Sequence, residues 1–411
     1  MISKLKSELS NQSIFTLVKW FLKKSYMRMF KMIDLFIIRL LKLLPIKAFY
    51  IVLESEGDYT DNIRTFYDYL LSVQATKKYK VIWIVHNPEQ YKHHKNVEFV
   101  SRYGGRIHFK FDYYTAVSKF LLFSHPYWLT NWRNKQVVVD TTHSVAQLKA
   151  ASAATKKMKM FDYFLSCSPY CSQIKEQSLH TDLSSALVMG MPRIDLLYQH
   201  KECLPMLINN YKSEKIILSM ETFKQTKYWS DSAHKDSYAI NVIQSQAELE
   251  KLDKILGKNK YKMLVKIHHL QSLSFLNRVT LSNIVYLTDD DLAKHDIQVN
   301  ELVENADILL TDYSSVFYEF LLLDRPIGFL IGDMNEYARG FIMEHPLDEM
   351  PGQKIRNYKE LLTFIDRSNS TPDEFSEQRS IVRNKVFIYK DNKNCERFFN
   401  WIQQQNKGIE E

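Results

Sequence analysis

Cysteine is scarce in this chain and follows no metal-binding or disulfide pattern. Only four cysteines occur among 411 residues, and none stands in paired C-x-x-C spacing. The sequence therefore predicts neither a disulfide framework nor a structural zinc site, and it favours a reducing compartment.

Glycine and proline are also few, with ten of each. Together with 45% hydrophobic, 13% aromatic and 25% charged residues, this composition excludes collagen-like, disordered and low-complexity chains. At roughly 100 to 200 residues per domain, the length predicts two domains with an appendage.

Long apolar runs are missing as well. Between residues 14 and 44, charged side chains interrupt every apolar stretch, and none approaches the ~20 residues that a spanning helix needs. No small-residue cleavage site follows these stretches. We therefore expect neither a transmembrane helix nor a secretory signal.

The positive charge is concentrated at the N-terminus. The formal net charge is +8, and residues 1–47 carry all of it, with ten basic and two acidic side chains. Within this arm, apolar residues recur every three to four positions with lysine and arginine between them, which predicts one or two basic amphipathic helices. An anionic membrane surface is the favoured partner. A helix packed on the protein body is the main alternative, and nucleic acid is disfavoured because the remaining residues are neutral overall.

The rest of the chain alternates strands with helices, which predicts an α/β fold with parallel sheets. We expect a first series with strands at 48–53, 79–85, 97–100, 136–140, 161–166 and 186–189 and helices at 62–73, 113–122 and 168–177. The second series has expected strands at 215–219, 263–267, 284–287, 307–310 and 327–331 and helices at 299–304 and 315–323. The predicted parts are the arm (1–47), an N-terminal domain (48–210), a C-terminal domain (211–370) and helices that fold back across the domain seam (371–411).

The most informative motif follows the strand expected at 307–310. It reads Thr311-Asp312-Tyr313-Ser314-Ser315, and a helix is expected to begin at the second serine. Hydroxyl groups and unpaired backbone N–H groups converge at such a helix start, which favours phosphate binding. Helix capping alone is the simpler interpretation, because serine and aspartate are preferred caps.

Further polar residues stand at strand ends and in loops. Lys266 and His268 lie where the strand at 263–267 ends, and ligands bind at strand carboxyl ends in open α/β sheets. Arg339 stands in a loop and is suited to clamp a phosphate. His143 follows the strand at 136–140, and an ordinary histidine pKa near 6.5 suits a general base.

Taken in order, these segments resemble the CDP-glycerol glycerophosphotransferase family, the enzymes of wall teichoic acid and related capsular polymer synthesis in Gram-positive bacteria. The family's Asp-Tyr-Ser-Ser block resembles residues 312–315, and its Gly-Tyr-Pro-Arg-Asn-Asp turn resembles residues 190–195. Its Trp-His-Gly-Thr-Pro-Leu-Lys block resembles residues 142–149, where the histidine, leucine and lysine match but the other residues differ. The family's Lys-x-His-Pro strand end resembles residues 266–269, with His269 in place of the proline.

The resemblance implies a GT-B-like fold, in which two Rossmann-like domains face each other across a cleft. It implies transfer of an alditol phosphate, in the first instance glycerol phosphate, from CDP-glycerol or another CDP-alditol. The acceptor is expected to be a lipid-linked glycan or polyol phosphate at the cytoplasmic face of the cell membrane, with the protein bound peripherally. No cofactor is implied, and since no carboxylate pair has metal spacing, we predict a metal-independent reaction.

The resemblance also assigns roles to individual residues. His143 is the expected general base, and His268 is its partner or a phosphate ligand. The residues expected to bind substrate are Arg193, Asp195, Lys266, Thr311, Asp312, Ser314, Ser315 and Arg339. The alternatives are a ribitol-phosphate transferase of the same family, a GT-B glycosyltransferase that uses a nucleotide sugar, and a non-catalytic membrane-bound partner.

Overall fold

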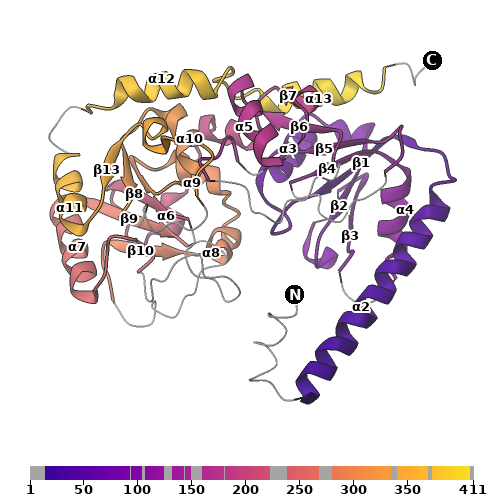
Figure 1. Ribbon diagram of the computed structural model, residues 1–411, viewed down its shortest axis with the longest axis horizontal. Coiled ribbons are helices and arrows are strands. Elements are labelled where there is room, and N and C mark those ends of the chain that lie inside the picture. Colours follow the sequence, from indigo (N-terminus) through magenta and orange to yellow (C-terminus); the bar gives the residue numbers. More distant parts are fainter. Residues whose placement is uncertain are drawn as a thin grey trace. The chain divides into compact units, whose positions relative to one another are not determined.

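The structure is a computed structural model, and the chain forms two compact units (Figure 1). Unit 1 contains Met1–Asp140, Met160–Asp162 and Asn406–Glu411, and unit 2 contains Thr141–Lys159 and Tyr163–Gln405. The structure describes residues 14–92, 94–103, 107–124, 132–142, 144–149, 160–179, 181–222, 238–267, 280–332, 334, 340–368 and 373–407. The domain limits drawn from the sequence stay a prediction.

Unit 1 is built on five parallel strands in the order β3-β2-β1-β4-β5. Their core residues are buried on both faces, as expected for parallel strands covered by helices. The strands are β1 (Lys47–Glu54), β2 (Lys80–Ile84), β3 (Val97–Val100), β4 (Ser118–Phe123) and β5 (Val137–Asp140). The helices of this unit are α2 (Ile14–Leu41), α3 (Asp61–Ser72) and α4 (Phe109–Val117).

The helix expected at 113–122 is wrong in its second half. Helix α4 ends at Val117, and the chain continues directly into β4, which pairs with β1 and β5. The reason is the run of apolar residues 120–123, all of them fully buried. Periodicity alone does not separate such a run in a central strand from a buried helix.

Unit 2 contains a parallel pair, β6 (Tyr163–Ser166) with β7 (Ala186–Val188), and a parallel six-stranded sheet in the order β10-β9-β8-β11-β12-β13. The six strands are β8 (Lys215–Met220), β9 (Tyr261–Lys266), β10 (Ile284–Leu287), β11 (Ile308–Thr311), β12 (Ile327–Leu330) and β13 (Gln353–Ile355). The α/β class expected from the sequence is therefore confirmed.

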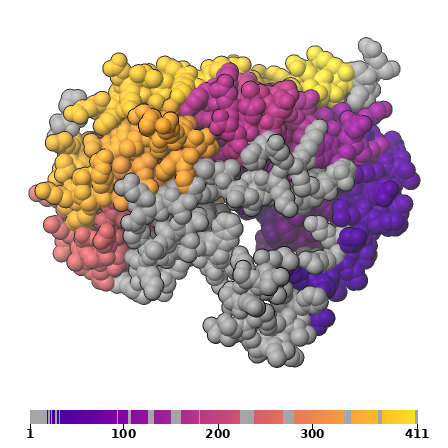
Figure 2. Space-filling model, viewed as in Figure 1, coloured from indigo at the N-terminus to yellow at the C-terminus, as the bar shows by residue number. Residues whose placement is uncertain are grey.

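The helices of unit 2 include those expected from the sequence and several that were not. They are α5 (Pro169–Leu179), α6 (Leu204–Leu207), α7 (Gln246–Lys258), α8 (Asp289–Lys294), α9 (Val299–Glu304), α10 (Val316–Phe320), α11 (Tyr358–Arg367), α12 (Ser376–Val386) and α13 (Asn394–Gln404). The C-terminal segment forms two helices, α12 and α13, and these residues, in yellow, lie at the surface of unit 2 (Figure 2).

Helix α2 is a single 28-residue helix that packs on α4. Large apolar side chains on it remain exposed, and three of them recur every seven residues: Leu22 (62% exposed), Met29 (50%) and Phe36 (62%). In the described part of the chain, no helix is both long and apolar enough to cross a membrane. Part of α2 is therefore a packed helix, as the alternative interpretation held, and part of its surface is an uncovered apolar stripe.

A pair of carboxyl groups lies where α2 meets α4. Asp112 of α4 is fully buried, and its burial, followed by the charge of Asp34 on α2, raises the pKa of Asp112 to about 7. Asp34 also accepts a hydrogen bond from the backbone N–H of His108, at 3.4 Å. The packing of α2 on α4 therefore depends on the protonation of Asp112.

We expect the Asp112→Asn variant to lose a pH dependence that the wild type shows. Because the folded state holds the Asp112 proton up to about pH 7 and the unfolded state releases it near pH 4, the free energy of unfolding falls as the pH rises through this window. In the variant this slope should be smaller. The free energy of unfolding of the variant minus that of the wild type should therefore be about 1 to 3 kcal/mol larger at pH 8 than at pH 4. Urea unfolding at both pH values measures the difference, and an unchanged slope would contradict the role of Asp112.

Candidate active site

Asp312 is the centre of a buried hydrogen-bond network at the carboxyl end of β11. Its side chain is fully buried and accepts hydrogen bonds from the backbone N–H (2.9 and 3.0 Å) and the hydroxyl (2.9 Å) of Thr222. It also accepts one from the backbone N–H of Ser314, at 2.9 Å. Thr311 donates its hydroxyl to the carbonyl of Met220, the last residue of β8. The motif therefore joins the ends of two neighbouring strands.

Lys149 joins this network from a segment that lies far away in the sequence. Its Nζ donates to the hydroxyl oxygen of Thr222 at 3.0 Å. That hydroxyl has one proton, which it gives to Asp312, so the bonds run in one direction from the ammonium group through the hydroxyl to the carboxylate. The two motif blocks, 142–149 and 311–315, thus meet within unit 2.

A third segment, residues 340–342, lies against both blocks. Phe341 forms an antiparallel bridge with Lys149, and the N–H of Ile342 donates to the carbonyl of Leu148 at 2.8 Å. The ring of Phe341 meets that of Tyr313 edge to face, with centroids 5.4 Å apart. The segments 142–149, 311–315 and 340–342, which lie far apart in the sequence, are therefore neighbours in space.

Thr142 has a strained backbone directly before His143. Its φ is 48°, in the left-handed region, which is a rare conformation for a β-branched residue. The hydroxyl of Thr142 donates to the carbonyl of Ser144 (3.2 Å) and accepts from Nζ of Lys175 (2.9 Å), a buried lysine of α5. Lys175 also donates to the carbonyl of Leu165 at 2.8 Å. Such strain persists only where the surroundings fix it, and it concentrates at functional sites.

The two serines of the motif lie at the start of α10. Ser315 is the N-cap residue, but its side chain makes no capping hydrogen bond. Both serines are half-buried, and the backbone N–H of Ser314 donates to Asp312 and not to a serine hydroxyl. Capping by the serine hydroxyls, the simpler interpretation of the sequence, therefore does not account for Ser315.

Lys266 lies at the carboxyl end of β9, as the sequence predicted. Its Nζ is 2.8 Å from Oδ1 of Asp289 and donates to the carbonyl of Ile267 at 2.8 Å. Its side chain is buried. Lys266 thus shares the strand-end edge of the sheet with Asp312, but no hydrogen bond of the described residues links the two.

Arg193 and Asp195 stand in a 3-10 helix over Pro192–Tyr198 and make contacts outside the network of Asp312. Arg193 pairs with Glu319, a buried carboxylate that also accepts from Asn300 at 2.6 Å. Glu319 thus links α10 both to the 3-10 helix of Arg193 and, through Asn300, to α9. The substrate-binding role expected for Arg193 stays a prediction.

Asp195 holds the start of α13. Its carboxylate accepts hydrogen bonds from the backbone N–H groups of Asn394 and Cys395, both at 2.9 Å, and from the Asn394 side chain at 2.7 Å. Burial raises the pKa of Asp195, and these bonds partly offset the rise. A Cβ on Gly190, whose φ is 87°, would lie 1.7 Å from Oδ1 of Asn394, so this turn requires glycine. A role of Asp195 in substrate binding is not tested by these contacts.

Three predicted site residues, His143, His268 and Arg339, lie outside the described residues. Among the residues that the structure does describe, no group of three or more His, Cys, Asp or Glu side chains is arranged to hold a metal ion. The four cysteines are buried and free.

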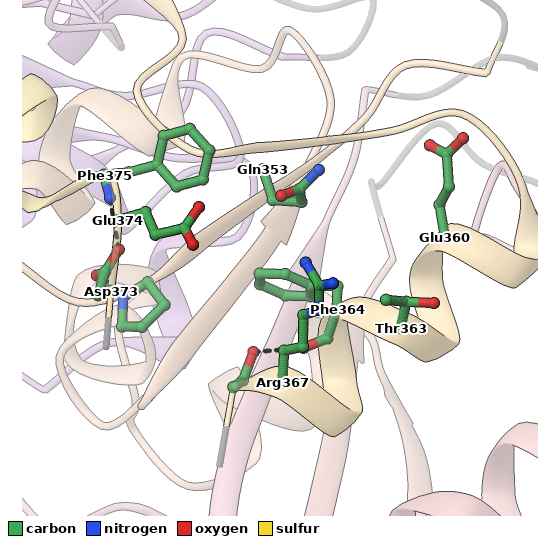
Figure 3. A pocket seen from close by; sticks show the side chains of 10 residues that line it. Gln353, Glu360, Thr363, Phe364, Arg367, Asp373, Glu374 and Phe375 are labelled. Carbon is green, nitrogen blue, oxygen red and sulfur yellow. Dashed lines mark hydrogen bonds between the residues drawn. The ribbon is translucent and has the colours of Figure 1, made fainter. Parts of the chain in front are cut away.

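A cavity of about 170 Å³ lies elsewhere in unit 2 (Figure 3). Its lining includes Pro326, which precedes β12, and Gln353, the first residue of β13, together with side chains of α11 such as Arg367. These positions lie where the parallel strands β12 and β13 begin, so the cavity is at the edge of the sheet opposite to the carboxyl ends at which Asp312 stands. The cavity is therefore separate from the motif cluster.

Comparison with known protein families gives one match over most of the chain. The family described as CDP-Glycerol:Poly(glycerophosphate) glycerophosphotransferase matches residues 36–404. This agrees with the resemblance drawn from the motifs.

Individual relatives share about a quarter of their residues with the chain. The teichoic acid poly(glycerol phosphate) polymerase of Bacillus subtilis (strain 168) is 25% identical over 361 residues, or 80% of this chain and 45% of the polymerase. The teichoic acid glycerol-phosphate transferase of Staphylococcus aureus (strain NCTC 8325 / PS 47) is 28% identical over 252 residues, or 59% of this chain and 60% of the transferase. The chain thus spans about half the length of these relatives. Teichoic acid ribitol-phosphate primases and polymerases also match, at 22% to 29% identity.

Solved structures of the wall teichoic acid polymerase TagF share the fold. A TagF variant soaked with CDPG has a TM-score of 0.72 and 20% identity, with 92% of this chain and 94% of that chain covered. The GT-B-like fold expected from the sequence is confirmed by this likeness.

Proposed function

Since the chain belongs to the CDP-glycerol:poly(glycerophosphate) glycerophosphotransferase family, we propose that it transfers glycerol phosphate from CDP-glycerol to a hydroxyl group of an acceptor and releases CMP. The product is a phosphodiester of a teichoic acid or capsular polymer. The observation that carries this proposal is the chain of hydrogen bonds from Lys149 through Thr222 to Asp312, since it brings the motif blocks 142–149 and 311–315 together in one compact unit.

The proposed reaction is a phosphoryl transfer. The acceptor hydroxyl oxygen attacks the β-phosphorus of CDP-glycerol, a new P–O bond forms, and the bond from this phosphorus to the bridging oxygen breaks. CMP leaves with that oxygen and its electron pair, and the hydroxyl proton passes to His143. An alcohol is a weak nucleophile at neutral pH, so a base next to it accelerates the attack.

The negative charge that develops on the diphosphate needs fixed donors. In our proposal, Ser314 and Ser315 supply them at the end of β11, where Asp312 fixes the backbone of Ser314. His268 and Arg339 complete the phosphate ligands. Thr311 and Lys266 support the strand ends, and Arg193 and Asp195 hold the turn at 190–195 next to α10 and α13.

The donor is tested by incubating the full chain with radiolabelled CDP-glycerol, CDP-ribitol and UDP-sugars in separate reactions with a lipid-linked acceptor. CMP release from CDP-glycerol with label in the polymer supports the proposal. CMP release from CDP-ribitol alone would indicate the ribitol-phosphate alternative, and UDP release a glycosyltransferase. Nucleotide binding without release of any product would identify a non-catalytic partner.

We also propose that the protein works at the cytoplasmic face of the membrane, where a lipid-linked acceptor is anchored. The support is the basic charge of residues 1–47 and the exposed apolar stripe of α2, because an amphipathic helix of this kind lies in the headgroup region of anionic lipid.

Substitution of the α2 stripe should release the protein from vesicles of anionic lipid. We expect the double variant Leu22→Gln/Phe36→Gln to bind such vesicles at least about tenfold more weakly, because two exposed apolar side chains no longer enter the lipid. Sedimentation with phosphatidylglycerol vesicles measures this. The matched control is Ile381→Gln/Ile388→Gln, which removes two similarly exposed apolar side chains from unit 2 (63% and 51%). Equal losses in both variants would contradict a specific role of α2.

A further inference from the structure

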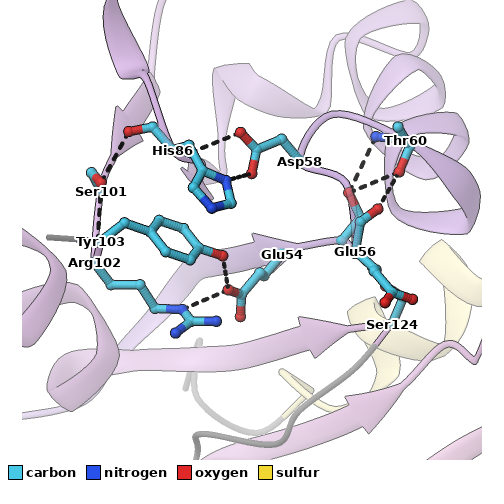
Figure 4. A network of polar contacts seen from close by, with 10 residues as sticks. Glu54, Glu56, Asp58, Thr60, His86, Ser101, Arg102, Tyr103 and Ser124 are labelled. Atoms are coloured by element: carbon cyan, nitrogen blue, oxygen red, sulfur yellow. Dashed lines mark hydrogen bonds and ion pairs between the residues drawn. The ribbon is translucent and has the colours of Figure 1, made fainter. Parts of the chain in front are cut away.

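A second polar cluster, made of residues that no sequence motif marked, lies at the carboxyl edge of the unit 1 sheet (Figure 4). Four neighbouring parallel strands end here: β3, β2, β1 and β4. The chain runs from β1 outward to β3 and then returns to place β4 on the other side of β1, so the topological switch point lies between β1 and β4. Open α/β sheets bind their ligands at this position.

The two strands that flank the switch point are joined by polar contacts. Ser124, directly after β4, donates its N–H to the carbonyl of Glu54 at 3.1 Å, and its hydroxyl accepts from the N–H of Glu56 at 2.9 Å. The Glu54 carboxylate, at the end of β1, accepts from Nε of Arg102 (2.6 Å) and from the hydroxyl of Tyr103 (3.2 Å). Burial, followed by the charge of Glu54, raises the pKa of Tyr103, which keeps this hydroxyl a donor.

His86, two residues after the end of β2, is held from two sides. Asp58 accepts from its backbone N–H at 2.8 Å and contacts its ring Nδ1 at 2.6 Å. The ring of Tyr103 stacks on the imidazole, with centroids 3.6 Å apart and an angle of 15°. Asp58 itself has a left-handed φ of 66°. The side chain of His86 is nevertheless 56% exposed.

The orientation of His86 defines what it can bind. In the neutral imidazole, a carboxylate at Nδ1 places the ring proton on that nitrogen, and Nε2 then carries a lone pair. No partner among the described residues reaches Nε2. A histidine that is fixed in this way offers a hydrogen-bond acceptor to a ligand that carries a hydroxyl group.

The charge of the cluster further restricts which kind of ligand it can bind. Among the described residues of the cluster, three carboxylates, Glu54, Glu56 and Asp58, accompany one guanidinium group, Arg102. This excess of negative charge disfavours a phosphate and favours an uncharged group whose hydroxyls donate to carboxylate and imidazole acceptors.

We propose that this cluster binds the uncharged, hydroxyl-bearing part of the acceptor, a sugar or a polyol, with His86 Nε2 as a direct ligand. The inference rests on the proposed function for the identity of the acceptor. A transferase with two substrates needs a second site besides the one at Asp312, and the edge of the unit 1 sheet offers one with its own oriented ligand.

Binding is tested first, without turnover. Saturation-transfer NMR on the full chain, with the methyl glycoside of a neutral disaccharide, glycerol and glycerol 3-phosphate as probes, should show contact with a neutral probe and little with the phosphate. The disaccharide and glycerol arms distinguish a sugar from a polyol. Equal contact with glycerol 3-phosphate, or no contact with either neutral probe, would overturn the proposal. This readout does not depend on CDP-glycerol, so it fails or succeeds independently of the proposed reaction.

Variants of His86 then test the assignment. Asparagine retains a donor toward Asp58 but has no group at the position of Nε2, whereas glutamine places an amide oxygen near that position. We expect His86→Asn to raise the KM for the acceptor about tenfold, with the KM for CDP-glycerol and the melting temperature unchanged, and His86→Gln to recover most of the loss.

His200 provides the matched control. It pairs with Glu304 through Nδ1 at 3.0 Å and is 78% exposed, but it belongs to unit 2 and not to this cluster. His200→Asn should leave both KM values unchanged. An acceptor KM for His86→Asn equal to that of the wild type, or equal losses in both variants, would overturn the role of His86.

Discussion

Replacement of His143 by alanine is expected to lower kcat for CMP release by about 10² to 10⁴, because the acceptor hydroxyl then loses its general base. The KM for CDP-glycerol should change little, since His143 is not among the proposed donor ligands. Stopped assays with radiolabelled CDP-glycerol measure both constants. The exposed residue His295, at the end of α8, offers a control, and His295→Ala should turn over normally.

The strained residue beside His143 provides an independent check. Thr142→Val removes the hydroxyl that Lys175 holds, whereas Thr142→Ser keeps it. If the backbone at 142 positions His143, kcat should fall in the valine variant and recover in the serine variant. Near-normal turnover of His143→Ala would refute the assignment of the base.

Replacement of Asp312 by alanine is expected to have the second large effect. The variant leaves two N–H groups and one hydroxyl without their buried acceptor and frees the backbone of Ser314. We expect the free energy of unfolding to fall by about 2 to 4 kcal/mol and kcat/KM for CDP-glycerol to fall at least about 10²-fold. Urea unfolding and initial-rate kinetics measure the two effects separately.

Asp253 in α7 separates the structural effect from the catalytic one. It is also a buried aspartate that accepts from three backbone N–H groups, those of Ser282, Asn283 and Ile284, at 2.6 to 3.1 Å. These groups lie where β10 begins, at the opposite edge of the sheet. Asp253→Ala should therefore cost similar stability while the folded fraction keeps its kcat/KM. Equal kinetic losses in both variants would show that Asp312 acts through stability alone.

The local pattern of apolar and polar residues was sufficient to predict much of the fold. The strands at 97–100 and 284–287 and the helix at 299–304 have the bounds expected from the sequence, because apolar runs or helical spacing end there at clear polar residues. The error at β4 arose where an apolar run follows a helix without a break. Local sequence does not show which buried run pairs with another strand, because that depends on the rest of the sheet.

The site was predictable only where a motif marks it. The residues 311–315 stand out in the sequence, but Thr222 and Lys175 do not, since each acts on a partner far along the chain. Thr222 is 90 residues from Asp312, and Lys175 is 33 residues from Thr142. A single threonine or lysine in such a position has no local signal.

The contact of Asp195 with the start of α13 has a consequence for synthesis of the chain. The two partners, Asp195 and Asn394, are 199 residues apart. At about 5 to 20 residues per second, a ribosome needs roughly 10 to 40 s to make the intervening chain. During this interval the carboxylate of Asp195 and the turn at Gly190 lack the helix that buries them. The nascent protein therefore completes this part of unit 2 only when α13 has left the ribosome.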